Sequence, residues 1–101
     1  ARVDCHKVGL GACMFTQISL ERHSAEVVEN FERAVMNTPE IMECHVVTGD
    51  SDFLLKILVE SPEAYDAFLH RFLFNLPGVR QTRTIVALRE IKHETRLPIK
   101  D

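Results

Sequence analysis

The chain contains the same pattern at two places, Asn37-Thr38-Pro39-Glu40-Ile41 and Asn75-Leu76-Pro77-Gly78-Val79. Each copy ends a helical stretch that begins at a serine, Ser24 in the first and Ser61 in the second, and the serine-to-proline spacing is 15 and 16 residues respectively. Both copies lead directly into a strand-like segment. A repeat of this kind predicts two matched strand–helix–strand halves, which restricts the possible topologies.

Both helical stretches carry signals at their ends. Ser24 and Ser61 are expected N-cap residues, because a serine hydroxyl accepts a hydrogen bond from a free backbone N–H of the first turn. Pro62 suits the first helical position, where its missing N–H costs nothing. Pro39 and Pro77 end the helices, because the residue before a proline avoids helical geometry. Apolar residues at three- and four-residue spacing form one stripe on each helix: Val27, Val28, Phe31 and Val35 on the first, and Tyr65, Phe68, Leu69, Phe72 and Leu76 on the second.

Further segments have the composition of strands: Cys13–Leu20, Ile41–Thr48, Phe53–Glu60 and Arg80–Ile91. The expected order is therefore β-α-β-β-α-β, in which right-handed crossovers join the strands of each half. A turn at Gly49-Asp50-Ser51 joins the halves. This order predicts an α+β, ferredoxin-like fold with a four-stranded antiparallel sheet and both helices on one face.

Two helices cover only one face of such a sheet, so the other face is a candidate contact surface. Alternate side chains of a strand point to opposite faces, which divides Phe53–Glu60 into two sets. The residues expected to leave apolar atoms on the second face are Leu54 and Leu58, Ile85 or Val86, and members of the pair Met14 and Ile18. A contiguous apolar patch marks a partner surface. Because two-fold homodimers are the commonest assemblies, we expect a homodimer formed through the sheet.

Composition excludes several classes of protein. The chain has 101 residues, 46% hydrophobic and 27% charged, as in one globular domain rather than a disordered tail. It contains no apolar run long enough to span a membrane and opens without the apolar run of a secretory signal, so we expect no membrane partner. The net charge of −3 argues against direct binding of nucleic acid by this segment. Three irregularly spaced cysteines, Cys5, Cys13 and Cys44, are expected to be reduced thiols in a cytoplasm.

Asp50 and Asp52, in Thr48-Gly49-Asp50-Ser51-Asp52, form the most conspicuous polar cluster. Two interpretations stay open on spacing alone. One is a loop that binds a small zwitterion or a metal, and the other is a hairpin turn, since glycine and aspartate are the residues that tight turns select. A second polar run, Gln81-Thr82-Arg83-Thr84, has the same two interpretations: hydrogen bonds to a ligand's carboxylate or amino group, or a solvated strand end.

No motif indicates catalysis or a cofactor. A metal site is not expected, because Cys5-His6 and Cys44-His45 are adjacent pairs whose side chains point to opposite faces of a strand, and no Cys-x-x-Cys occurs. Metalloprotease, nucleophile-elbow, phosphate-loop and dinucleotide motifs do not occur either. We therefore expect a protein that is not an enzyme, with no catalytic residue, metal or cofactor. The alternatives are a small dimeric ferredoxin-like enzyme and a stand-alone assembly domain.

Several motifs, in order along the chain, resemble those of one family. Ala1-Arg2-Val3-Asp4, followed by Lys7-Val8-Gly9-Leu10, resembles the segment that leaves the DNA-binding domain of Lrp/AsnC-type (feast/famine) transcriptional regulators. The run Glu43–Lys56 is similar to that family's central signature: Glu-Cys, an aromatic residue or histidine, then Thr-Gly and a pair of acids. The match continues in Leu76-Pro77-Gly78-Val79, Thr82-Arg83-Thr84 and Leu97-Pro98-Ile99.

The resemblance implies a ligand-sensing RAM domain (regulation of amino acid metabolism). In the family such domains pair through their sheets into dimers, and dimers assemble further, often into octamers. An amino acid or related effector binds between dimers, near the Gly-Asp-x-Asp loop and the polar start of the last strand. The residues that the resemblance carries over to this site are Thr48, Gly49, Asp50, Asp52, Gln81, Thr82 and Thr84, of which Gln81 rests on position alone.

The family's N-terminal helix-turn-helix domain has no counterpart in these 101 residues. Residues 1–11 resemble the hinge or linker strand that follows it, and residues 12–101 resemble the ligand-binding and oligomerisation domain. We therefore expect the amino-acid-effector-binding and oligomerisation domain of an Lrp/AsnC-type regulator. DNA binding belongs to the absent domain and is assigned to no residue here. As a hypothesis, Asp50 or Asp52 pairs with the effector's ammonium group.

Overall fold

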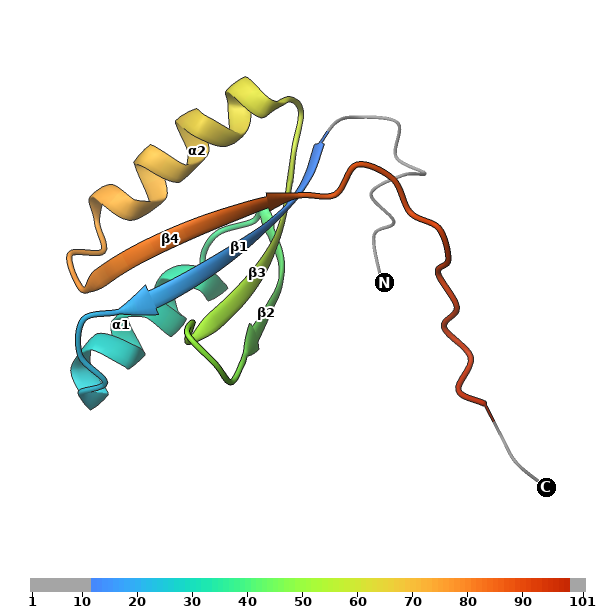
Figure 1. Cartoon of the computed structure of the whole chain (residues 1–101). Helices are drawn as coiled ribbons and strands as arrows, with labels where there is room; N and C mark the ends of the chain where they lie inside the picture. The colour runs from blue at the N-terminus through green and yellow to red at the C-terminus, as the bar shows by residue number, and fades with distance from the viewer. Residues whose placement is uncertain (1–11, 99–101) are drawn as a thin grey trace.

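The computed structural model describes residues 12–98 of the chain (Figure 1). The elements follow the β-α-β-β-α-β order that the repeat predicts. They are β1 (Ala12–Leu20), α1 (Ala25–Met36), β2 (Ile41–Val46), β3 (Phe53–Val59), α2 (Pro62–Phe74) and β4 (Val79–Val86). The hinge strand expected within residues 1–11 lies outside the described residues.

The strands form one antiparallel sheet in the order β2-β3-β1-β4. The strands of each half are separated by one strand of the other half, so each helical crossover passes over a neighbouring strand. Both helices lie against the same face of the sheet, and the opposite face is left open (Figure 1). The predicted ferredoxin-like fold is confirmed.

The helix ends follow the local signals in the sequence. The Ser24 hydroxyl accepts a hydrogen bond from the Val27 N–H at 3.3 Å, and the Ser61 hydroxyl accepts one from the Ala64 N–H at 3.0 Å. Each helix ends at the asparagine of its Asn-x-Pro pattern, which is the C-cap residue. Because these signals act within one turn of helix, they could be located from the sequence alone.

The core lies between the sheet and the two helices. Phe31 of α1 is 1% exposed, and its ring centroid lies 4.4 Å from that of Phe53 in β3 and 6.3 Å from that of Phe72 in α2. The turn before β4 also lies close to α1. A Cβ at Gly78 would therefore lie only 2.8 Å from Cγ1 of Val27. The aromatic contacts and this turn join the two halves of the repeat.

Three strands end earlier than the sequence predicted, and β3 does so by one residue, at Val59 rather than Glu60. β2 ends at Val46, since Val47 already belongs to the hairpin loop. β4 ends at Val86 rather than Ile91. Met14–Val86 is the last pair between β1 and β4, although β1 itself continues to Ala12. Strand-like composition therefore did not show where this pairing stops.

The open face of the sheet differs from the prediction in β1. Met14 and Ile18 were expected there, but they are 2% and 0% exposed and belong to the core, so that prediction was wrong. Phe15 lies on the open face instead, paired with Ile85 of β4, whereas Val86 pairs with Met14. Met14 and Phe15 are both apolar neighbours, and only strand pairing determines which one faces the helices. The open-face patch, as we call it, consists of Phe15, Leu54, Leu58 and Ile85.

Candidate functional site

The polar hairpin loop, Val47–Asp52, connects β2 to β3 at the end of the sheet where β1 ends and β4 begins. Several loops therefore meet at this end. Gly49 has a φ angle of +109°, a conformation that other residues rarely adopt, and no atom of the described residues lies within 4 Å of the place where its Cβ would be. Glycine is thus required here by the backbone conformation, not by lack of space.

Asp52 fastens this loop to the end of β1. Its Oδ2 accepts a hydrogen bond from the Leu20 N–H at 2.8 Å, and its Oδ1 lies 3.0 Å from Nε2 of His23. Its own N–H donates to the Ile18 carbonyl at 2.9 Å. The pKa of the Asp52 carboxyl is lowered, mainly by the hydrogen bond from the Leu20 N–H. Partial desolvation raises this pKa, and His23 and Arg80 lower it further. Both carboxylate oxygens of Asp52 are therefore engaged within the domain.

Asp50 has a different environment, although only one residue separates it from Asp52. Its backbone carbonyl accepts a hydrogen bond from the Ser19 hydroxyl at 3.1 Å, which fixes the position of its backbone. Its side chain is exposed, and within residues 12–98 its carboxylate has no ion-pair partner. Of the two aspartates, Asp50 is the one available to a ligand.

A concavity of about 210 Å³ lies beside Asp50 on the open side of the sheet. The residues that line it are Gln17, Val47, Thr48, Asp50, Ser51, Leu54 and Arg83. A carboxylate and a guanidinium thus border the same small space, and an aliphatic side chain, Leu54, also lines it. This arrangement suits a small zwitterion, whose ammonium and carboxylate groups need opposite charges.

The sequence predicted two of these lining residues, Thr48 and Asp50, but not Gln17 or Arg83. Gln17 pairs with Leu54 on one side and with Arg83 on the other, so strand register brings these three residues together. Arg83 belongs to the polar run of the last strand. Because side chains alternate between the two faces of a strand, Arg83 faces the opposite side from Thr82 and Thr84. The face that it occupies depends on the pairing of β4 with β1, which composition does not reveal.

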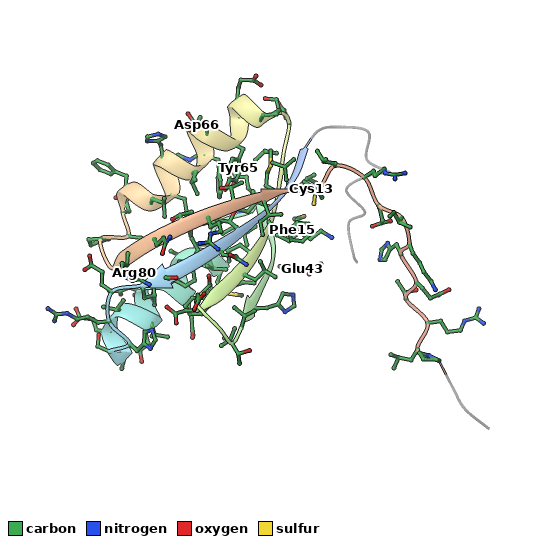
Figure 2. All side chains as sticks on the ribbon, in the orientation of Figure 1. Cys13, Phe15, Glu43, Tyr65, Asp66 and Arg80 are labelled. Carbon is green, nitrogen blue, oxygen red and sulfur yellow. The ribbon has the colours of Figure 1, made fainter. Side chains whose placement is uncertain are left out.

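The other residues expected from the last strand lie elsewhere. Thr84 is on the helix-covered face, where its hydroxyl lies 2.6 Å from the Tyr65 hydroxyl, which in turn lies 2.8 Å from the buried Thr16 hydroxyl. Figure 2 shows Tyr65 between α2 and the sheet. Thr82 pairs with Ile18 of the core, and Gln81 is exposed at the start of the strand. The structure therefore does not bring Thr82 and Thr84 to the concavity beside Asp50.

A larger groove, of about 540 Å³, runs between α1 and the turn that leads into β4. Its floor is apolar and includes Val27, Phe31 and Leu76, and its rim includes Arg22 and Arg33. It does not include the hairpin loop. The rim side chains are exposed, and we assign the groove no ligand.

Groups that could serve metal or thiol chemistry are sparse in the described part of the chain. Within residues 12–98, no three His, Cys, Asp or Glu side chains are placed to hold a metal ion. In the same residues, no helix is long and apolar enough to cross a membrane. Cys44 is a free thiol, and its partial desolvation, together with the charge of Glu32, raises its pKa. Cys13 is disulfide-bonded, so the expectation of a reduced thiol was wrong for that residue. Cys5 lies outside the described residues.

Comparison with known proteins bears directly on this site. The family model for the Lrp/AsnC ligand binding domain matches residues 13–97. The chain belongs to the Lrp/AsnC family. These residues form its ligand-binding domain, which confirms the family and the type of domain that the sequence motifs indicated.

The relatives are transcription regulators. The chain is 42% identical over 100 residues to the leucine-responsive regulatory proteins of Escherichia coli (strain K12) and Klebsiella pneumoniae, covering 99% of this chain. It spans 61% of the length of those relatives.

Solved structures of the family have the same fold. An AsnC family transcriptional regulator from Agrobacterium tumefaciens superposes with a TM-score of 0.82 at 34% identity, covering 97% of this chain and 63% of that one. A transcriptional regulator from Neisseria meningitidis, solved as a complex with L-Met, superposes with a TM-score of 0.84 at 32% identity, with the same coverage.

Proposed function

We propose that this domain senses a free amino acid for an Lrp/AsnC-type transcription regulator and binds it at the concavity beside Asp50. One observation carries the proposal: Asp50 and Arg83 border one space of about 210 Å³. The Neisseria meningitidis relative in complex with L-Met supports the ligand class. The family is regulatory, so the ligand is bound and released without being converted.

Each polar group has a proposed role. Asp50 receives the effector's ammonium group and Arg83 its carboxylate, because charge-assisted hydrogen bonds are the strongest that these groups form. Thr48 and Gly49 shape the rim of the loop, and Asp52 holds the loop in place without touching the ligand. Among the residues carried over from the family, Gln81 and Thr82 complete the site from a neighbouring copy, and Thr84 acts only through its contact with Tyr65.

The open-face patch is the proposed dimer surface. It is apolar, it lies on the face that the helices leave uncovered, and two copies of it can pair around a two-fold axis. Further assembly of dimers, up to an octamer, would place the hairpin loops of different copies side by side. An effector that binds such a shared site shifts the assembly by its differential affinity for the two states.

The chain spans 61% of the length of its relatives, and we propose that it is part of a longer regulator. We propose that the parent is a cytoplasmic regulator and that a separate domain binds DNA. The described body of this domain supports that division, because residues 12–87 carry eleven acidic and six basic side chains. A negative surface does not favour contact with phosphates.

Thermal unfolding in the presence of each of the twenty amino acids tests this function. A ligand at about 100 times its dissociation constant adds roughly 2.7 kcal/mol to the free energy of unfolding, which raises the Tm of a domain this size by about 10 °C or more. We expect one chemical group of amino acids to raise the Tm. We expect Asp50→Asn to abolish the rise.

The matched control is Asp66→Asn, because Asp66 is 80% exposed and lies on α2, away from the loop. It changes the net charge by the same amount and should leave the response intact. The proposal fails if no amino acid stabilises the unmodified domain, or if Asp50→Asn responds as Asp66→Asn does.

A further inference from the structure

The chain continues beyond β4 as an arm, residues 88–98, which runs away from the body of the domain (Figures 1 and 2). The arm contains no helix or strand. Three of its side chains are large and apolar, and they are almost fully exposed: Leu88 is 91% exposed, Ile91 86% and Leu97 80%. Exposed apolar residues grouped on one extended segment indicate that something else covers them.

Some side chains of the arm interact with neighbours within the arm. Nδ1 of His93 lies 3.7 Å from a Glu90 carboxylate oxygen, and the Arg96 N–H donates to the Glu94 carboxylate at 2.9 Å. These contacts join residues two or three positions apart.

We propose that the arm is exchanged between two copies of this chain, each arm lying on its partner in the sheet-to-sheet dimer. The inference rests on the proposed function, since it deepens the dimer described there. Its first support is continuity: the arm follows β4 directly, and Ile85 of β4 is part of the open-face patch. The arm therefore starts at the rim of the surface against which the partner packs.

Its length is sufficient to reach the partner. At about 3.3 Å per residue, eleven extended residues cover roughly 36 Å. Packed sheets lie about 10 Å apart, and a four-stranded sheet is about 15 Å wide from the first strand to the last. The arm can therefore cross the gap and reach an edge of the partner's sheet.

The charges of the arm and the body are complementary. Residues 88–98 carry three basic side chains, Arg89, Lys92 and Arg96, against two acidic ones. Residues 12–87 carry eleven acidic side chains against six basic ones. The arm thus combines apolar anchors with an excess of positive charge, which is opposite in sign to the net charge of the body.

The test measures the dimer dissociation constant of the full chain by sedimentation across a dilution series. We expect the double variant Leu88→Asp, Ile91→Asp to raise that constant at least tenfold. The matched control places the same two charges on exposed apolar residues of the helices, Met36→Asp and Phe74→Asp, which are 83% and 86% exposed. The control should dimerise as the unmodified chain does, and circular dichroism should show the same helix content in all three proteins.

A second measurement follows the arm directly. Trypsin cuts after Arg89 and Lys92, and we expect cleavage there to slow as the protein concentration rises through the dissociation constant. Cleavage whose rate does not depend on concentration overturns the proposal, because an arm that is always free or that folds onto its own copy behaves in that way.

Phe15→Asp separates this inference from the proposed dimer surface. If Phe15→Asp prevents dimerisation and the arm variant does not, the sheet-to-sheet dimer stands and the exchange of arms is overturned. If the arm variant alone prevents it, the exchange is supported and pairing through the open-face patch is contradicted. If the arm variant dimerises as the helix-surface control does, the exchange is overturned whatever Phe15→Asp does.

Discussion

The helix-covered face and the open face of the sheet are formed by the same strands but are completed in different ways. On β3, the side chains toward the helices are buried at every alternate position, and those toward the open face are half-buried. The first face is closed within one chain by aromatic rings from α1 and α2. The second is buried against another copy in the proposed dimer. One strand thus contributes to folding with one set of side chains and, in the proposed dimer, to assembly with the other.

The largest expected effect comes from a matched pair of phenylalanines on the two faces. Phe31→Ala should lower the free energy of unfolding by about 3–5 kcal/mol, because it removes a fully buried ring that contacts Phe53 and Phe72. Phe15→Ala should leave the unfolding of the monomer nearly unchanged and weaken the dimer. Urea unfolding at low protein concentration measures the first quantity, and sedimentation measures the second. Equal losses of monomer stability would contradict the division between the faces.

A smaller effect is expected from the hydroxyl chain on the helix-covered face. Tyr65→Phe removes the group that joins Thr16 to Thr84 and leaves the Thr16 hydroxyl, which is 0% exposed, without that partner. A buried hydroxyl left unpaired costs about 1–3 kcal/mol. Chemical denaturation should show this loss with little change in dimerisation. If dimerisation weakens instead, Tyr65 also supports the open face.

The hairpin loop belongs to neither face, and Gly49→Ala tests its backbone. The left-handed conformation at Gly49 should cost about 1 kcal/mol with an alanine there. The space around Gly49 is open among the described residues, so no steric clash should add to this cost. Thermal unfolding gives the loss in stability, and titration with the effector gives the loss in affinity. If Gly49→Ala were as stable as the unmodified domain, the loop would have to adopt another conformation.

The smallest expected effect is a pH dependence at the same loop. The pKa of Asp52 is lowered from its ordinary value of 3.8, so the unfolded chain binds a proton more readily than the folded one. The stabilisation is therefore complete above the ordinary pKa and is lost as the pH falls through the lowered pKa of the folded state. Asp52→Asn should flatten the dependence of stability on pH between about pH 5 and about pH 2. A slope unchanged between the unmodified domain and Asp52→Asn would contradict the assignment.

Much of the fold follows from signals that act over a few residues. The serine caps, the proline-terminated helices and the alternation in β3 are local, so the sequence predicts them, and the repeat then orders the elements. The face of β1 could not be predicted in the same way. Met14 and Phe15 are adjacent and both apolar, and the hydrophobic pattern alone does not choose between them. The end of β4 was predicted wrongly because it depends on where its neighbour is still paired.

The candidate site divides along the same line. A loop rich in glycine and aspartate is evident in the sequence, because tight turns and ligand loops select the same residues. The different environments of Asp50 and Asp52 are not evident in the sequence, because the two residues are of the same type and only one residue separates them. The end of β1 engages the carboxylate of Asp52, while strand register places Arg83 in the lining of the concavity that Asp50 also borders. Composition and spacing are properties of short segments, whereas the partners of a side chain depend on contacts between segments far apart in the chain.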